Sequence, residues 1–313
     1  MLSVAKCGWY PTRRGALGGL GLLGLVAGRG ARAEAPFVVA SKSDTEGTLT
    51  GAMIAEILAR LGLPVERRLG LGPTLIVRTS LLSGEVTIYP EYTGNGAFFT
   101  ATETDPVWKS PQSAFETIRR RDAERGLVWL ERAPANNTWL IAVNGDLARR
   151  ERLATMSDFA GAVRRGLIRL AASTEFVESP AALPSFEAAY GFSLALDDII
   201  SLPGGDTAVT ARAAAQGISG VNAGMVYGTD GALSALDLTV MSDPLNAQIV
   251  YEVAPVIRAD ALARHPEIGP ALARVFTTLE APTLRRLNAR ITVEGEVAEA
   301  VAARYLSENG LLP

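Results

Sequence analysis

Hydrophobic and polar residues follow two distinct spacings along most of the chain. Short runs rich in β-branched and aromatic residues are typical of strands, whereas apolar residues at every third or fourth position are typical of amphipathic helices. The second spacing is clear at residues 49–61, where Met53, Ile54 and Ile57 fall on one helix face. We predict strands at residues 37–40, 65–69, 86–89, 127–130, 139–143, 168–172, 224–227, 238–241 and 251–257. We predict helices at residues 49–61, 206–216 (with Asp206 as the N-cap), 259–264, 268–279 and 297–308.

Strands that alternate with helices indicate an α/β fold built on largely parallel sheets with helices on both faces. The C-terminal region departs from this pattern, because its three helical segments follow the last strand without another strand. The chain has 313 residues, and single cores tend to divide near about 250–300 residues, so we expect two lobes with a cleft. Clefts of such folds lie at the carboxyl ends of parallel strands, so ligand-binding groups are expected in the turns that follow strands.

The first 35 residues have the organisation of an export signal. A basic start ends at Arg13 and Arg14, a glycine-rich apolar stretch follows, and small residues surround Ala33 and Ala35. Interior glycines disfavour a buried helix, and the apolar stretch is shorter than the about 20 residues of a membrane span. We expect residues 1–35 to be a signal peptide of the twin-arginine type, which places the mature protein in the periplasm.

Charge and residue counts exclude several classes of function. The 30 Lys and Arg residues against 33 Asp and Glu residues give a net charge of −3, so a nucleic-acid partner is not expected. Cys7 and His265 are single, which excludes disulfides, cysteine–metal clusters and every His-dependent triad except one built on His265. No paired carboxylates, nucleophile elbow or phosphate loop is evident, so we expect no cofactor and no enzymatic activity.

Three turns after predicted strands, at residues 88–95, 136–139 and 225–231, combine aromatic and polar residues. One interpretation is that their aromatic residues belong to the core or its rim, with satisfied polar tips. The other is an aromatic box, in which several electron-rich ring faces surround a quaternary ammonium group. The turns alone do not decide between these interpretations.

A series of motifs in one order resembles the glycine betaine/choline-binding proteins of osmoprotectant ABC transporters. The motifs are SKSDTE (41–46), IYPEYTG (88–94), NNTW (136–139), ASTEF (172–176), YGF (190–192) and YGTDG (227–231). NNTW, with LN at 287–288 and VEG at 293–295, resembles the low-affinity periplasmic glycine betaine-binding branch. This resemblance implies a type II periplasmic binding protein with two α/β lobes and a ligand cleft at the hinge. It implies lobe 1 at residues 36–135 and 250–313, and lobe 2 at residues 136–249.

The resemblance also implies a binding site. Tyr92 in lobe 1, Trp139 and Tyr227 in lobe 2 and Tyr251 near the hinge are expected to form an aromatic cage, which is complete only when the lobes close. Lys42 is expected to contact a ligand carboxylate, with Asn137 near the cage.

The chain departs from the family pattern at two positions that concern the ligand carboxylate. Asn95 replaces a common threonine, and Ser179 replaces an arginine that several relatives have. Because a serine gives one neutral hydrogen bond where an arginine gives a charged pair, we expect weak glycine betaine binding or a ligand without a carboxylate, such as choline.

We therefore expect a monomeric, exported substrate-binding protein that delivers a quaternary amine to an ABC permease and its ATPase. Two alternatives stay open: a sensory protein that binds another small amine or an amino-acid-like solute, and an enzyme that uses the same cleft.

Overall fold

The computed structural model describes residues 35–203 and 207–313. The predicted signal peptide, apart from Ala35, and the predicted N-cap Asp206 lie outside the described residues. Residues Ala35–Pro313 form one compact unit that contains two five-stranded sheets. Each sheet, with the helices that cover it, is called a lobe below.

The sheet of the first lobe has the strand order β2-β1-β3-β10-β4. β1 is parallel to β2 and β3, whereas β10 is antiparallel to β3 and β4. Its strands are β1 (Phe37–Lys42), β2 (Val65–Gly72), β3 (Ile88–Tyr92), β4 (Leu127–Trp129) and β10 (Val253–Arg258).

Helices cover both faces of this sheet because alternate residues of its strands point to opposite sides. Phe37 and Val39 of β1 join one core with the apolar face of α1, while Ala40 joins a second core that includes Trp108. Asp44 caps α1 by accepting a hydrogen bond from the Gly47 backbone at 2.7 Å. The helices are α1 (Thr45–Arg60), α2 (Thr74–Ser83), α3 (Asn95–Phe99), the 3₁₀ turn η1 (Pro106–Lys109), α4 (Pro111–Ala123), α11 (Ala259–Arg264), α12 (Ile268–Phe276), α13 (Ala281–Thr292) and α14 (Ala298–Glu308).

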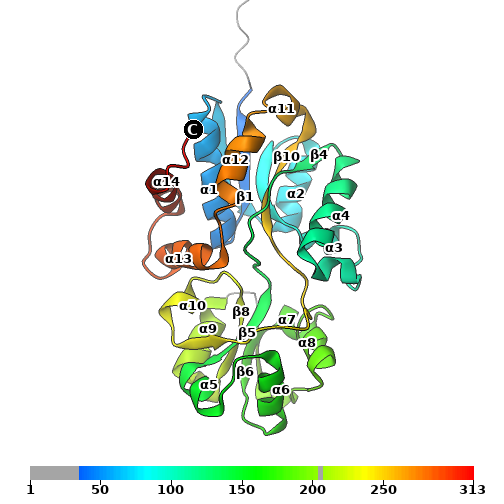
Figure 1. Cartoon of the computed structure of the whole chain (residues 1–313), viewed down its shortest axis with the longest axis vertical. Helices are drawn as coiled ribbons and strands as arrows, with labels where there is room; N and C mark the ends of the chain where they lie inside the picture. The colour runs from blue at the N-terminus through cyan, green and yellow to red at the C-terminus, as the bar shows by residue number, and fades with distance from the viewer. Residues whose placement is uncertain (1–34, 204–206) are drawn as a thin grey trace, which may run out of the picture. The chain divides into compact units, whose positions relative to one another are not determined.

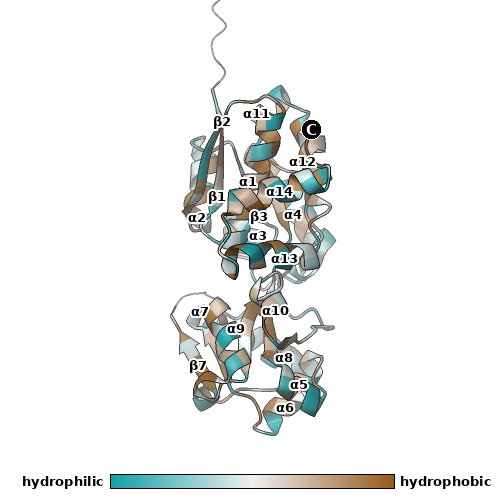
Figure 2. Ribbon diagram, turned by 90° about the vertical axis from the view of Figure 1, so that its left-hand side faces the viewer, coloured by the Kyte–Doolittle hydropathy of each residue, from teal (hydrophilic) through white to brown (hydrophobic). Residues whose placement is uncertain are grey.

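The sheet of the second lobe has the order β7-β6-β8-β5-β9 and the same mixture of strand directions. Its strands are β5 (Trp139–Asn144), β6 (Leu170–Ser173), β7 (Ile199–Leu202), β8 (Ala223–Tyr227) and β9 (Leu238–Val240). Its helices are α5 (Gly145–Glu151), α6 (Met156–Arg164), α7 (Thr174–Glu178), α8 (Leu183–Tyr190), η2 (Leu196–Asp198), α9 (Thr207–Gln216), η3 (Ile218–Gly220) and α10 (Ala232–Ala235). Hydrophilic residues, teal in Figure 2, cover much of α5 and of α13 in the first lobe.

Two chain segments connect the lobes and pair with each other. The outgoing segment follows β4, and the returning segment precedes β10; they are green and yellow-orange in Figure 1. Asn136 and Glu252 form an antiparallel bridge, and the Thr138 hydroxyl donates to the Ile249 carbonyl at 2.7 Å. The connection is therefore a paired strand-like crossing rather than a single linker.

Each predicted strand overlaps an observed one, but three expectations were wrong. The sheets are mixed rather than largely parallel, because β5 and β10, which join the crossing segments, run opposite to their neighbours. The short, half-exposed strand β7 lacks the alternation that marks a strand and was not predicted. The C-terminal region has a fourth helix, α13, whose arginine-rich sequence hides its narrow apolar stripe.

Candidate functional site

A cavity of about 1020 Å³ is lined by residues of both lobes and of the crossing segments. Six aromatic side chains contribute to its wall: Phe98 and Phe99 of α3, and the four that were predicted, Tyr92, Trp139, Tyr227 and Tyr251. The four predicted residues come from the end of β3, the start of β5, the end of β8 and the returning segment. The fold therefore brings to one cavity aromatic residues that are up to 159 positions apart, the separation of Tyr92 and Tyr251.

Strand register places two of these rings together. Trp139 and Tyr227 are directly opposite in the antiparallel pair of β5 and β8, so their side chains emerge on the same face of the sheet. The Trp139 ring packs edge-on against Phe176 at 6.1 Å between centroids and lies 6.3 Å from Tyr251 at a tilt of 58°. Trp139 is only 7% exposed, so its orientation is fixed by packing.

Two hydrogen bonds within the crossing hold the backbone of Tyr251. Its N–H donates to the Asn136 side-chain oxygen at 2.8 Å, and its carbonyl accepts from the Asn137 N–H at 2.9 Å. Its ring lies so close to Gly94 that a Cβ there would come within 2.7 Å of it. The glycine that follows Tyr92 and Thr93 is thus required for the close approach of the segments that carry Tyr92 and Tyr251.

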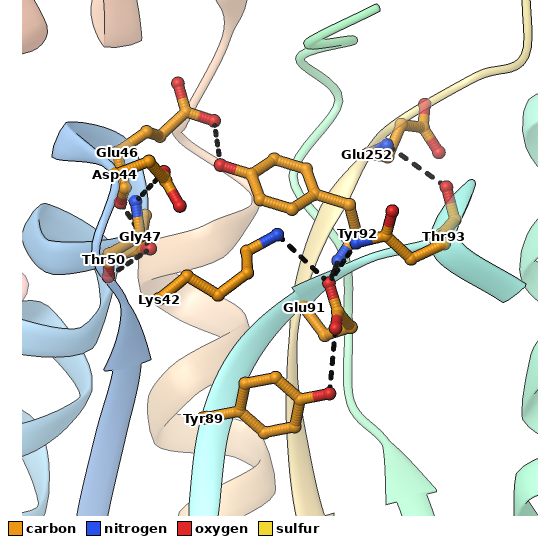
Figure 3. A network of polar contacts seen from close by, with 11 residues as sticks. Lys42, Asp44, Glu46, Gly47, Thr50, Tyr89, Glu91, Tyr92, Thr93 and Glu252 are labelled. Carbon is orange, nitrogen blue, oxygen red and sulfur yellow. Dashed lines mark hydrogen bonds and ion pairs between the residues drawn. The ribbon is translucent and has the colours of Figure 1, made fainter. Parts of the chain in front are cut away.

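Two contacts fix the side chain of Tyr92, one at its hydroxyl and one at its ring face (Figure 3). Its hydroxyl donates to the Glu46 Oε1 atom at 2.9 Å, and the Lys42 Nζ atom lies 4.1 Å from its ring centroid. Tyr92 is 4% exposed, and burial raises its pKa well above the usual value. One face of the ring is therefore already occupied by an ammonium group of the protein.

A buried carboxylate, Glu91, binds two of the four polar residues that were expected at the ligand site, Lys42 and Asn95. Its Oε1 atom accepts from Lys42 Nζ at 3.2 Å and from Asn95 Nδ2 at 2.7 Å. The same oxygen accepts from the Tyr92 N–H at 2.7 Å, and its Oε2 atom accepts from the Tyr89 hydroxyl at 2.8 Å. The charge of Lys42 is thus neutralised within lobe 1. Sequence reasoning missed this role of Glu91, although its position beside Tyr92 was a signal.

Glu46 connects Tyr92 to α13. Its Oε2 atom accepts from Asn288 Nδ2 at 2.9 Å, and the same amide donates to the Thr229 carbonyl of the second lobe at 2.9 Å. Burial raises the pKa of Glu46 to about 7, although interactions with Thr229, Asn288 and Tyr92 oppose the shift. Neither Glu46 nor Asn288 was among the predicted site residues, because their contact joins positions 242 residues apart.

The turn after Tyr227 packs against α13 and the crossing through its glycines. A Cβ at Gly231 would come 2.4 Å from the Ala289 nitrogen, and a Cβ at Gly228 would come 2.2 Å from the Asn136 oxygen. Arg285 of α13 also donates to the Gly228 carbonyl at 2.8 Å. Side chains at these positions would push the turn away from the first lobe.

The charge of the cavity wall is predominantly negative. Among the described residues of the wall, Lys42 is the only cationic side chain, whereas five side chains carry carboxyl groups: Asp44, Glu46, Glu103, Glu175 and Asp230. Burial raises the pKa of Tyr227 to about 12 and also raises that of Tyr251, so both phenols stay neutral. Neutral ring faces beside carboxylates favour a cation.

Two polar atoms near the aromatic rings have no hydrogen-bond partner among the described residues. They are the Asn137 Oδ1 atom and the Trp139 Nε1 atom, both buried. The Trp139 indole is still near enough to the Tyr227 hydroxyl to oppose the rise in that residue's pKa. A buried donor and a buried acceptor of this kind are normally satisfied by water or by a ligand.

Similarity to known proteins decides the family. A family model described as the substrate binding domain of ABC-type glycine betaine transport systems matches residues 35–308. The chain belongs to this family.

Individual relatives agree with the family match. Glycine betaine-binding protein YehZ of Escherichia coli is 49% identical over 281 residues, which cover 89% of this chain and 92% of YehZ. A glycine-betaine-binding protein of Pseudomonas aeruginosa is 31% identical over 302 residues and covers 94% of each chain. The solved structure of apo YehZ superposes with a TM-score of 0.78, at 49% identity, over 89% of this chain and 100% of that one.

These comparisons confirm the resemblance found in the motifs and the predicted class of fold, a type II periplasmic binding protein with two α/β lobes. In residues 35–203 and 207–313, no helix combines the length and apolarity that a membrane crossing needs. The same described residues contain no group of three or more His, Cys, Asp or Glu side chains placed to hold a metal ion.

Most of the predicted site residues lie at the cavity. The lining residues include Lys42, Tyr92, Asn95, Asn137, Trp139, Tyr227 and Tyr251. Ser179 is the C-cap of α7, is half-buried, and is not one of the described residues that line the cavity.

Proposed function

We propose that this protein captures a quaternary ammonium compound, glycine betaine or choline, and delivers it to an ABC permease driven by its ATPase. The observation that carries the proposal is the convergence of Tyr92, Trp139, Tyr227 and Tyr251 on one cavity whose wall is rich in carboxylates. The family supports this function, and its named relatives in E. coli and P. aeruginosa are glycine betaine-binding proteins.

The four rings supply affinity as an aromatic cage. Each ring face contributes about 0.5–2 kcal/mol to the binding of a desolvated cation. Micromolar affinity corresponds to about 8 kcal/mol, so the cage provides much of the gross energy before the cost of ordering the protein is subtracted. The carboxylates add long-range attraction for the ammonium group.

Closure of the lobes completes the cage. Tyr92 belongs to the first lobe, Trp139 and Tyr227 to the second, and Tyr251 to the crossing segment. We place the lobe boundaries at residues 36–135 with 250–313, and at residues 136–249. A ligand that contacts rings of both lobes binds the closed arrangement more tightly and so shifts the population toward it.

The polar residues favour choline over glycine betaine. Lys42 and Asn95 are both bonded to Glu91, and Ser179 is not part of the described cavity wall, so a ligand carboxylate would meet no unpaired cation there. Its remaining partners are neutral groups such as the Trp139 indole N–H. The carboxylate would also approach the carboxylates of the wall, which repel it.

We further propose that residues 1–35 direct export and that the mature protein acts as a monomer in the periplasm. Delivery to a permease requires this location, and the paired arginines before the apolar stretch support the twin-arginine route.

Calorimetric titration of the mature protein with glycine betaine, choline, carnitine and proline tests the proposal. We expect saturable binding of the quaternary amines and none of proline. Trp139→Ala should weaken choline binding by about 2- to 30-fold, the equivalent of one ring of the cage.

Phe192→Ala provides the matched control. Phe192 is also 7% exposed and lies in the second lobe, where it packs against Phe159 at 5.6 Å, but it does not line the cavity. This variant should lose stability and keep its affinity. Equal affinities for Trp139→Ala and the wild type would contradict the cage.

A further inference from the structure

Glu46 is a buried carboxyl group that lines the cavity and has no cationic partner. It is 4% exposed, and its hydrogen-bond partners are neutral: the Tyr92 hydroxyl, the Asn288 amide and the Thr229 side chain. No lysine or arginine of the described chain forms an ion pair with it, because Lys42, the nearest cation in the network of Figure 3, is paired with Glu91. A buried charge without a counterion is costly, so this position calls for a function.

We propose that Glu46 determines ligand specificity, by supplying an uncompensated negative charge beside the cage that favours cationic amines over zwitterionic ones. The inference rests on the proposed function, since it assigns the charge class of the ligand in the same cavity. A cationic ligand supplies the counterion that the protein withholds. A zwitterionic ligand also carries a carboxylate, which Glu46 repels, so Glu46 adds less to its binding free energy.

The charged and titratable groups around Glu46 do not supply its counterion, so that part is left to the ligand. On α1, Asp44 adds a second negative charge and raises the pKa of Glu46 further. On β3 and β1, the charges of Glu91 and Lys42 cancel each other, and Tyr92 is neutral.

The groups that face Glu46 from α13 and the turn after Tyr227 do not neutralise it either. Asn288 and Thr229 are neutral partners of Glu46, and Asp230 is a further carboxyl group of the cavity wall. Arg285 donates to the Gly228 carbonyl and interacts with Asp230 rather than with Glu46. No described side chain on these elements therefore forms an ion pair with Glu46.

Ionisation of Glu46 should consequently be linked to binding. Its pKa of about 7 means that the carboxyl group is largely protonated in mildly acidic solution and ionised in mildly basic solution. A bound cation stabilises the carboxylate form, so binding should release a proton near neutral pH, and cation affinity should rise as the pH rises. Zwitterion binding should show a smaller dependence.

Glu46 also positions Tyr92, and the two roles are separable. Glu46→Gln keeps the size of the side chain and an acceptor for the Tyr92 hydroxyl but removes the charge. Tyr92→Phe removes the hydroxyl and keeps the carboxylate. Loss of positioning should weaken both ligand classes alike, whereas loss of the charge should change the ratio of the two affinities.

The experiment is titration of the wild type, Glu46→Gln and Tyr92→Phe with choline and with glycine betaine at about pH 6 and about pH 8. Glu56→Gln is the matched control, since Glu56 lies on the same helix and pairs with Arg60 and Arg67 away from the cavity. We expect Glu46→Gln to lower the ratio of choline to betaine affinity by about tenfold and to abolish its pH dependence. Glu56→Gln and Tyr92→Phe should preserve the ratio.

The wild type gives a second readout that does not depend on the folding of any variant. Choline titrations in two buffers of different ionisation enthalpy should show proton release, and glycine betaine titrations should show less. A wild type that binds both amines without this difference, or a Glu46→Gln variant with an unchanged ratio, overturns the inference alone. A wild type that binds no quaternary amine overturns the proposed function, and this inference with it.

Discussion

Substitution of Gly231 by alanine tests whether the turn after Tyr227 must lie against α13 for tight binding. Gly231 has φ −61° and ψ −34°, which any residue adopts, so an alanine costs nothing in backbone conformation. The added Cβ, however, would come 2.4 Å from the Ala289 nitrogen and 2.6 Å from its Cα. Both atoms belong to the backbone of a helix and cannot move aside, so the turn must move.

The expected magnitude follows from this overlap. Forcing an extra methyl group into a packed contact costs about 1–3 kcal/mol. If the contact belongs to the ligand-bound arrangement, the whole cost appears as weaker binding, about 5- to 150-fold. Choline affinity measured by calorimetry, with thermal unfolding in parallel, is the assay.

Gly161→Ala is the control. Gly161 lies in α6 of the same lobe, and the nearest atom to its added Cβ is the end of the Arg164 side chain at 3.9 Å. This variant should gain about 0.5–1 kcal/mol of stability, because alanine restricts the unfolded chain, and should bind as the wild type does. Unchanged or tighter binding by Gly231→Ala would refute the reasoning, because the contact would then not belong to the bound state.

Two further predictions concern stability. Asp122→Asn should lower the free energy of unfolding by about 3 kcal/mol without changing affinity, because Asp122 is 1% exposed, pairs with the buried Arg78 and accepts from the Trp129 indole at 2.7 Å. Chemical denaturation measures the loss, and a loss below about 1 kcal/mol would contradict it. Because burial raises the pKa of Glu46 from 4.5 to about 7, the folded protein holds a proton between these pH values that the unfolded chain has released. The stability that this proton contributes should therefore be complete below about pH 4.5, and the free energy of unfolding should fall by about 3 kcal/mol as the pH rises from there through 7. The difference between wild type and Glu46→Gln in denaturation midpoints across this range isolates the effect, and parallel pH profiles of the two proteins would count against it.

Local features of the sequence were enough to predict the α/β class, every described strand except β7, and five of the helices. The spacing of apolar residues in α1 is visible in the sequence because a helix repeats over short distances. Its N-cap is equally local, since Asp44 accepts a hydrogen bond from the N–H of Gly47, only three residues further along. The aromatic turns were also recognisable, since Tyr92, Trp139 and Tyr227 each stand beside small and polar residues at the edge of a strand. Motif order then indicated the family.

Tertiary structure decided which polar groups are available to a ligand. Lys42 was expected to bind a carboxylate, yet it is neutralised by Glu91, which lies 49 residues away on a neighbouring strand. Glu46 was noted only as part of a motif, and its link to Asn288 spans 242 residues through a helix that was not predicted. The mixed strand directions likewise follow from the crossing segments. Such contacts depend on how separate elements pack, and a hydrogen bond or an ion pair between distant positions leaves no periodic trace in the chain, whereas a helix or a capped turn does.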